Sequence, residues 1–508
     1  MSTQRIFSHV PSRSLTKDPE ADFSSLSLNA SSLQALFLDC ADFTLRPVWP
    51  GGVHTEGIFL CWLDGLVSAR SVAEEVLHPL ASASLAQELR SPSGLALALQ
   101  RGGIWAGSVQ RRDTAADTVQ DLLQGCCALV FDRSGLALTF EVKSDDTRSI
   151  SDPKVEKTLK GAKDAFVETL RTNTSLVRRR LRTPTLKLRQ ITVGRRSSTS
   201  IAILYIEGLT APELVAALCS RLEQIDVDGI TASGNIEQYI VDRPLSAFPQ
   251  LLHTERPDMF SAELLAGRAG FFVDGLPMGF LTPATLSSFL HVAEDRAQPP
   301  PAAALLTLLR WFSLIISLVL PAFFTAIVMY HQEMIPTALL QNMIEAKQQV
   351  PFSEAFEILM MLVAFELLME AGIRLPNPVG DTVSIIGGLI VGQSAVEAKV
   401  VSPISVIIVA ASAICGFTLP SRDLGSAIRL LRAAFTLLSI FFGLLGLSLG
   451  LALLLWYLCT IDSFGVPYTS PMSEGGFFEI LRALVRLPLP RDKLRDRALH
   501  PRDRRNQV

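Results

Sequence analysis

The sequence lacks the residue patterns that mark most enzymes and metal proteins. Its seven cysteines form no CxxC pair, and its seven histidines form no HExxH pair or other metal-ligand spacing. It also lacks a GxxxxGK[ST] loop, which would cradle the phosphates of a nucleotide. A net charge of −3 gives no global field that would favour nucleic acid. We therefore expect no enzymatic activity, no metal, no cofactor and no nucleic-acid partner.

The cysteines and the amino terminus both indicate a reducing compartment. The cysteine number is odd and most cysteines lie inside apolar runs, which favours buried reduced thiols over a disulfide framework. The start of the chain shows no charged stretch followed by an apolar one, as an export signal would. Residues 1–30 are rich in serine and are expected to be disordered. The folded part that follows is expected to lie in the cytosol.

Two pairs of matching blocks indicate a tandem repeat in the first part of the chain. Asp64-Gly65-Leu66 follows an apolar run and precedes a helical pattern, and Glu207-Gly208-Leu209 repeats this arrangement. LLQG at 122–125 and LLAG at 264–267 form a second pair with almost the same spacing. Two independent blocks that keep one spacing predict a duplicated α/β unit.

We expect the first α/β lobe at 31–150 and the second at 195–298. Each reads as a strand, a glycine turn, a helix and a late β-hairpin. Residues 151–194 carry a long helical pattern, from Val155 to Leu181, which predicts a connector helix between the lobes. A cleft between two lobes can bind a small ligand. Simple packing of the lobes as a platform for protein partners is the alternative.

The long apolar runs lie in the second part of the chain, and we predict a membrane domain over 299–465. The run 302–330 is interrupted only by Arg310, and the runs 401–420 and 433–461 carry no charge. Each is long enough for a transmembrane helix, since about 20 apolar residues cross a bilayer. The predicted fold class is a two-lobed α/β soluble domain with a duplicated lobe, followed by an all-α polytopic membrane domain.

A glycine-rich segment, 379–398, is predicted as the fourth span. Small residues recur along it every four positions, and polar residues follow them. The candidate pore-lining or gating residues are Ser384, Gly388, Gly392, Gln393, Ser394 and Glu397. The small residues favour close packing between helices. The polar ones favour a helix that partly faces water, because a lipid-facing helix has little reason to carry them. The sequence leaves both interpretations open.

The segment 353–374 is apolar at its centre and acidic toward its ends. Its residues Glu366, Glu370 and Arg374 are spaced four apart, so they lie near one another along a helix. Charges inside a bilayer are costly and usually face protein or water. We therefore predict an interfacial or re-entrant helix with solvated charges in place of a fifth span.

The final segment, 466–508, is strongly basic and is predicted to be a cytosolic tail under the positive-inside rule. It can also contact anionic headgroups of membrane lipid. With both ends of the chain inside, four spans satisfy the topology. This arrangement conflicts with the positive-inside rule at one point, because it places Arg422, Arg429 and Arg432 on the outer side of the membrane.

Several long segments, in the same order along the chain, are similar to one known family. They are RTNTSLVRRRL (171–181), AILYIEGL (202–209), HTERPDMFSAELLAGRAGFFVDGLP (253–277), LPAFFTAIVMYHQEMIP (320–336), EAGIRLPNPVGDTVSIIGGLIVGQSAV (370–396) and GVPYTSP (465–471). Together they resemble the A subunit of GerA-type spore germinant receptors. The match departs at Lys160-Gly161-Ala162, where family members usually carry Gly-Pro.

This resemblance implies a multi-pass protein of the inner spore membrane that takes part in nutrient-triggered germination. It implies a transporter-like B subunit and a lipoprotein C subunit as partners. It also implies a homo-oligomer that forms a gated channel for the release of monovalent cations. The paralogue SpoVAF shares these motifs. An SpoVAF-like or non-conducting scaffold subunit of a spore membrane complex is therefore the alternative.

Overall fold

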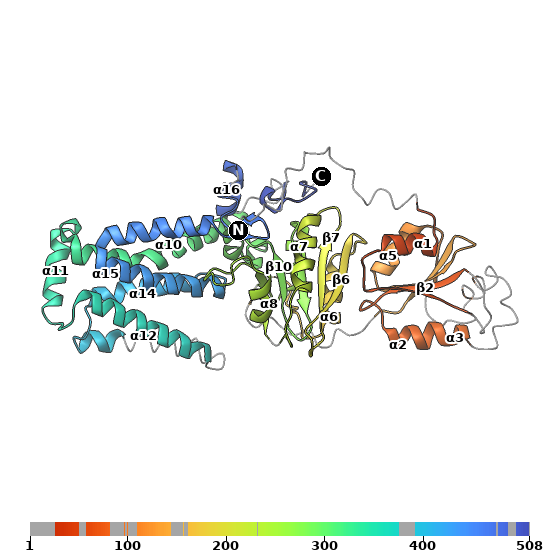
Figure 1. The fold of residues 1–508 in the computed structure, drawn as a ribbon, viewed down its shortest axis with the longest axis horizontal. Helices are drawn as coiled ribbons and strands as arrows, with labels where there is room; N and C mark the ends of the chain where they lie inside the picture. Colours follow the sequence, from red (N-terminus) through yellow and green to blue (C-terminus); the bar gives the residue numbers. More distant parts are fainter. Residues whose placement is uncertain are drawn as a thin grey trace.

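The computed structural model has two α/β lobes in a row, followed by a helical bundle (Figure 1). The described residues are 26–49, 57–81, 96, 99, 109–143, 156, 161–230, 232–374, 392–473, 476–485 and 494–506. Most of the segment predicted to be disordered, 1–30, lies outside them. Leu28 is described and buried, so the first lobe begins before residue 31.

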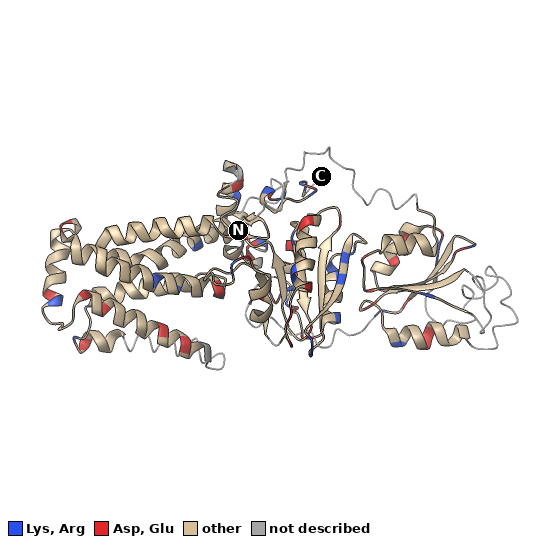
Figure 2. Ribbon diagram, in the orientation of Figure 1, with Lys and Arg blue, Asp and Glu red and all other residues tan. Residues whose placement is uncertain are grey.

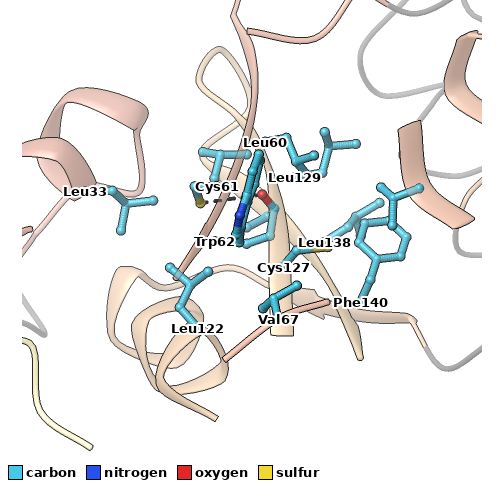
Figure 3. Close-up of a cluster of buried hydrophobic side chains, with 14 of the residues drawn as sticks. Leu33, Leu60, Cys61, Trp62, Val67, Leu122, Cys127, Leu129, Leu138 and Phe140 are labelled. Atoms are coloured by element: carbon cyan, nitrogen blue, oxygen red, sulfur yellow. Dashed lines mark hydrogen bonds between the residues drawn. The ribbon is translucent and has the colours of Figure 1, made fainter. Parts of the chain in front are cut away.

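The first lobe contains a five-stranded antiparallel sheet in the order β1-β2-β4-β5-β3. Its elements are α1 (Ala30–Leu36), β1 (Phe43–Pro47), β2 (Ile58–Leu63), α2 (Ala69–Ser71), a π-helical turn (Val72–Leu77), α3 (His78–Ala81), β3 (Val109–Arg112), α5 (Ala115–Leu123), β4 (Cys126–Phe131) and β5 (Leu136–Glu141). Leu33 of α1, Leu122 of α5 and Leu129 of β4 belong to its core (Figure 3). This core is separate from the cores of the rest of the chain.

The second lobe contains a sheet in the order β6-β7-β9-β10-β8, which matches the first sheet strand for strand. Its elements are β6 (Leu186–Val193), β7 (Thr199–Ile206), α7 (Pro212–Glu223), α8 (Ser233–Ile240), β8 (Leu252–Thr254), α9 (Pro257–Leu265), β9 (Ala269–Val273) and β10 (Gly279–Thr282). Strand β9 is buried along its whole length, because alternate side chains enter cores on the two faces of the sheet. Helices therefore cover both faces.

The glycines of the repeated blocks make equivalent turns in the two lobes. Gly65 and Gly208 have φ angles of 88° and 81°, and Gly125 and Gly267 have φ angles of 91° and 103°. Only glycine adopts this left-handed region without steric cost. Both lobes also contain the expected late hairpin, β4–β5 in one and β9–β10 in the other. The two folds thus agree with the repeat seen in the sequence.

The connector between the lobes differs from the predicted helix. Helix α6 spans only Leu170–Arg180, and the described residues before it, 161–169, are not helical. Strand β6 begins at Leu186, so the second lobe starts inside the segment that was predicted as connector, 151–194.

Tertiary contacts explain why the helix begins late. The side chain of Asn173 accepts a hydrogen bond from the Val167 amide at 2.8 Å and donates one to the Val167 carbonyl at 2.6 Å. The Phe166 ring packs edge-on against Phe260 and Phe272 of the second lobe. Burying this aromatic ring outweighs the local preference for helix, since a buried phenylalanine contributes about 1.5–3 kcal/mol.

A buried ion pair joins the two lobes. The Arg178 guanidinium donates to both carboxylate oxygens of Asp42, at 2.7 and 2.9 Å, and to the Leu186 carbonyl at 2.7 Å. Burial alone lowers the pKa of Arg178, but the Asp42 carboxylate raises it, and the net shift is upward. Cys40 and Leu188 form a parallel β-bridge beside this pair. The first lobe is therefore attached to the edge strand β6.

The helical bundle follows the second lobe. Its elements are α10 (Pro300–Tyr330), α11 (Thr337–Lys347), α12 (Glu354–Arg374), α14 (Pro403–Phe417), α15 (Arg422–Cys459), the two-residue strands β11 (Asp462–Ser463) and β12 (Val466–Pro467), and α16 (Phe477–Leu484). Two described helices, α10 and α15, are long and apolar enough to cross a membrane. Helix α14 is apolar but shorter, and 379–391 of the predicted fourth span lie outside the described residues.

The bundle exposes many large apolar side chains, whereas the lobes expose few. Phe312 of α10, Leu367 of α12 and Phe441 of α15 are among the exposed ones. Charged residues are sparse along α10 and α15 (Figure 2). A contiguous apolar surface of this kind is unusual in a soluble protein and typical of a membrane domain.

Helix α15 is not the single span predicted for 433–461. Gly443 interrupts it with a φ of 59° and a ψ of −141°. A Cβ on Gly446 would collide with the carbonyl of Leu438, and one on Gly450 would lie 3.3 Å from the Phe435 ring. In a continuous helix Phe435 and Gly450 would be about 22 Å apart at a rise of 1.5 Å per residue. The two arms, 422–442 and 444–459, therefore form an antiparallel hairpin.

The described part of the segment predicted as a basic cytosolic tail, 466–508, packs against the second lobe. Tyr468 is fully buried, and its carbonyl accepts a hydrogen bond from the Leu286 amide at 2.8 Å. Farther along, the Arg502 amide donates to the Leu209 carbonyl at 2.9 Å. The apolar residues of 461–468 and these backbone bonds hold the segment against the lobe.

We predict that the Arg178–Asp42 pair dominates the attachment of the first lobe. Arg178→Leu is expected to lower the free energy of unfolding by about 3–5 kcal/mol, because it leaves a carboxylate buried and unpaired. The double variant with Asp42→Leu is expected to lose much less than the sum of the single variants. Urea unfolding of the detergent-solubilised chain, followed by tryptophan fluorescence, measures these differences.

Arg180→Leu provides the matched control. Arg180 pairs with Asp164 at the surface, at 2.5 Å, and such pairs contribute less than about 1 kcal/mol. Equal losses for Arg178→Leu and Arg180→Leu would contradict a dominant role of the buried pair.

Candidate functional site

The predicted pore-lining residues are only partly described. Ser384 and Gly388 lie outside the described residues, and their role as a gate stays a prediction. Gly392 is buried and faces Val406 of α14, whose Cγ1 would lie 3.4 Å from a Cβ on this glycine. Packing is therefore the observed role of Gly392.

The polar candidates that follow Gly392 are exposed. Residues 392–397 are helical, and Gln393, Ser394 and Glu397 lie on the surface of the bundle. The Gln393 amide donates to the Glu397 carboxylate at 2.9 Å, across one helical turn. The structure thus joins Gln393 and Glu397 on the surface of one helical turn, with Ser394 exposed on the same short helix.

Helix α12 carries the predicted intramembrane or interfacial charges. Glu366 and Glu370 are one turn apart, and both are exposed. A carboxylate oxygen of Glu366 also lies 3.3 Å from a guanidinium nitrogen of Arg429 of α15. This ion pair connects the two helices. Arg374 is the last residue of α12, and its side chain lies outside the described part of the chain.

The acidic start of α12 is not solvated, in contrast to the prediction for 353–374. Glu357 is fully buried, accepts a hydrogen bond from the Ser402 amide at 2.8 Å and forms an ion pair with Lys347. Glu354 accepts a hydrogen bond from the Ser405 hydroxyl at 3.2 Å. These contacts join α11, α12 and the start of α14. Burial of the charge is possible because a lysine and a helix amino terminus compensate it.

Sequence reasoning missed this cluster. The partners of Glu357 lie on both sides of it in the chain, and no short motif links Lys347 with Ser402. The one local signal is Ser402-Pro403, which caps and starts α14 through a hydrogen bond from the Ser405 amide to the Ser402 hydroxyl at 3.3 Å.

Arg432, which the four-span prediction placed on the outer side of the membrane, is buried inside the bundle. It is 5% exposed, and its guanidinium donates to the Ser412 hydroxyl at 3.3 Å. Ser412 in turn donates to the Ser317 carbonyl at 2.8 Å. This chain of hydrogen bonds connects α15, α14 and α10 in the interior.

A cleft of about 600 Å³ lies between the two lobes. It is lined by residues 34–45 of the first lobe and by β6 and α7 of the second. Arg189 donates to the Asp39 carboxylate at 2.7 Å across the cleft, and this hydrogen bond raises the pKa of the guanidinium. The cleft has the size of a small-molecule site, and two of its charged residues, Arg189 and Asp39, are paired with each other.

The described residues contain no group of three histidine, cysteine or acidic side chains arranged to hold a metal ion. Of the seven cysteines, Cys459 is exposed and Cys126 and Cys415 are partly exposed, whereas the other four are buried. The sequence-based expectation of buried thiols is therefore wrong for Cys459, which lies at the end of α15.

Comparisons with known proteins identify the family of the chain. The family model described as Bacillus/Clostridium GerA spore germination protein matches residues 31–498. The uncharacterized membrane protein YfkQ of Bacillus subtilis (strain 168) is 34% identical over 91% of this chain and 88% of its own. Spore germination protein KA of the same strain is 34% identical over 95% of this chain and 88% of its own.

One solved structure is also similar. It is the crystal structure of the N-terminal domain of the A subunit of the Bacillus megaterium spore germinant receptor GerK3. The sequence identity is 28%, with coverage of 51% of this chain and 97% of that domain, and the TM-score is 0.41.

We predict that Glu357 stabilises the bundle. Glu357→Leu is expected to lower its free energy of unfolding by about 2–4 kcal/mol, because the Lys347 ammonium and the Ser402 amide lose their acceptor. The double variant Glu357→Leu, Lys347→Met is expected to regain part of the free energy of unfolding that Glu357→Leu loses. Thermal unfolding in detergent measures both effects. The exposed Glu345→Leu is the control and should change stability by less than about 0.5 kcal/mol. If Glu357→Leu is as stable as the parent, the cluster has no structural role.

Proposed function

The chain belongs to the GerA family of spore germination proteins, and we propose that it is the A subunit of a nutrient germinant receptor in the inner spore membrane. In this role it assembles with a transporter-like B subunit and a lipoprotein C subunit. Several copies form a gated channel that releases monovalent cations when nutrient binds the complex. The chain acts as a channel subunit in this proposal and not as an enzyme.

One observation carries the channel proposal. The outer surface of the bundle exposes many large apolar side chains, yet it also exposes polar and acidic ones. Among these are Glu366, Glu370, Gln393, Ser394 and Glu397. Exposed carboxylates are costly in lipid and favour a water-filled cavity or a protein partner. A pore shared by several copies of the chain supplies such water.

Symmetry determines where this pore would lie. In a closed ring each copy presents the same surface to the central axis. Glu397 on one copy would then form a ring of carboxylates with its counterparts. Rings of acidic side chains are a common filter in cation channels. The acidic character of the exposed set supports cations as the permeant ions.

The fold also supports transmission from the soluble lobes to the bundle. Leu286, Phe289 and Tyr468 of the second lobe belong to the same apolar core as Leu318 and Phe435 of the bundle. A shift of this lobe therefore moves α10 and α15 directly. A nutrient that binds elsewhere in the complex changes the fraction of open channels if its affinity differs between two positions of the lobe.

Cation flux from liposomes that contain the purified chain tests the proposal. Loss of one carboxylate about 4 Å from a hydrated cation removes about 1 kcal/mol of attraction, or about fivefold. Glu397→Gln is therefore expected to lower the flux about fivefold. Glu345→Gln removes an exposed carboxylate of α11 and should leave the flux unchanged. No flux from the parent chain, alone or with the B and C subunits, would contradict the channel.

The alternative is an SpoVAF-like or non-conducting scaffold subunit. The packing roles of Gly392, Gly446 and Gly450 favour it, since all three small residues contact neighbouring helices of the same chain. A scaffold would retain the B and C subunits in a pull-down while the liposomes stay impermeable. That combination of results separates the two functions.

A further inference from the structure

Both ends of α15 contact the second lobe. At its start, Asp423 lies 3.3 Å from the His253 imidazole of β8. Near its end, the Tyr457 ring lies 6.4 Å from the ring of Phe248. The middle of α15 reaches the opposite end of the bundle, where Gly443 contacts Tyr330. The chain therefore leaves the lobe and returns to it within one element.

Tyr330 stabilises the turn between the two arms. Its hydroxyl donates to the Ile440 carbonyl at 2.6 Å and lies 3.3 Å from the Phe441 carbonyl. These carbonyls lose helical partners because the helix breaks at Gly443. The Tyr330 ring occupies the space that a side chain on Gly443 would need, with ring carbons 3.0 Å from the position of its Cβ. The turn is thus a specific structure that requires glycine.

The outer surface of the hairpin is apolar. No charged residue occurs from 433 to 461. The large apolar side chains that it exposes are Leu430, Leu437, Phe441, Phe442, Leu445, Leu449, Leu453, Leu455 and Trp456. A surface without a single charge over this length fits lipid acyl chains as its partner.

The dimensions agree with a bilayer. The arms are about 31 and about 24 Å long at 1.5 Å per residue, against a hydrocarbon thickness of about 30 Å. The charged residues of the first arm, at 422–432, lie in its half nearer the lobe, and its uncharged part, 433–442, is about 15 Å long. One continuous helix over Arg422–Cys459 would be about 57 Å long, almost twice that thickness.

We propose that α15 is a membrane-inserted hairpin that enters the bilayer from the side of the lobes, turns at Gly443 near the far surface and returns, with lipid acyl chains covering its outer face. Arg422 and Arg429 then lie toward the same side as the lobes and the basic tail. The conflict of the four-span topology with the positive-inside rule disappears, because the arginines no longer lie outside. This proposal does not depend on channel activity.

Labelling of single cysteines in sealed membrane vesicles of known orientation tests the hairpin. The full-length chain carries Cys126, Cys415 and Cys459 replaced by serine, and a membrane-impermeant maleimide is the probe. Leu245→Cys reports the side of the second lobe, because this residue is 100% exposed. Met334→Cys, between α10 and α11, reports the far side.

The decisive positions are Ser426→Cys, at the start of α15, and Met472→Cys, after its end. The hairpin predicts that both react from the side of Leu245→Cys and not from the side of Met334→Cys. Reaction of Ser426→Cys from the side of Met334→Cys, with Met472→Cys on the lobe side, would show a single span and overturn the proposal.

Crosslinking gives a second, independent measurement. A short bis-maleimide is expected to join Phe435→Cys and Gly450→Cys within one chain, because the two arms place these positions together. The outward-facing pair Leu437→Cys and Leu453→Cys is the control. Failure of the first pair to crosslink in folded, membrane-inserted protein would also overturn the hairpin.

Discussion

A continuous apolar core between the second lobe and the bundle is the contact on which the rest of the structure depends. Tyr468 and Phe289 fill the junction, where aromatic ring centroids lie 6.2 Å apart. Leu318 of α10 and Leu458 of α15 extend the same core into the bundle. Apolar burial of this kind is non-directional but rigid, because protein interiors are packed as densely as organic crystals. The second lobe and the bundle therefore behave as one body.

The first lobe is attached in a different way. It has its own core, and a buried ion pair, a β-bridge and the rim of the cleft connect it to β6. An interface of polar contacts can open and close at a lower cost than a shared apolar core. Relative motion of the lobes is thus expected at the cleft and not at the junction of the second lobe with the bundle.

Several charges within the bundle are paired or hydrogen-bonded with groups of another element. Arg310 of α10 donates to Asp295 of the second lobe at 2.6 and 2.9 Å, which neutralises the charge that interrupts the first apolar run. Glu366 pairs with Arg429, and Arg432 donates to a hydroxyl of α14. Uncompensated charges would be costly in an apolar environment. The exposed carboxylate of Glu397, by contrast, has its one side-chain hydrogen bond among the described residues with Gln393 of its own helix.

The sequence by itself determined the repeat, the late hairpins, the apolar character of the second part of the chain and the family. These properties depend on residue order, glycine turns and hydrophobic runs, all of which are local or periodic. Tertiary structure alone decided where α6 begins, because Phe166 is held by a distant sheet. It also decided that Glu357 is buried, because its lysine and serine partners come from other helices. The turn at Gly443 could not be predicted from the sequence either, since an apolar run has the same composition whether it forms one helix or two. Only the contact with Tyr330, which is remote in sequence, distinguishes this glycine from the others in the run.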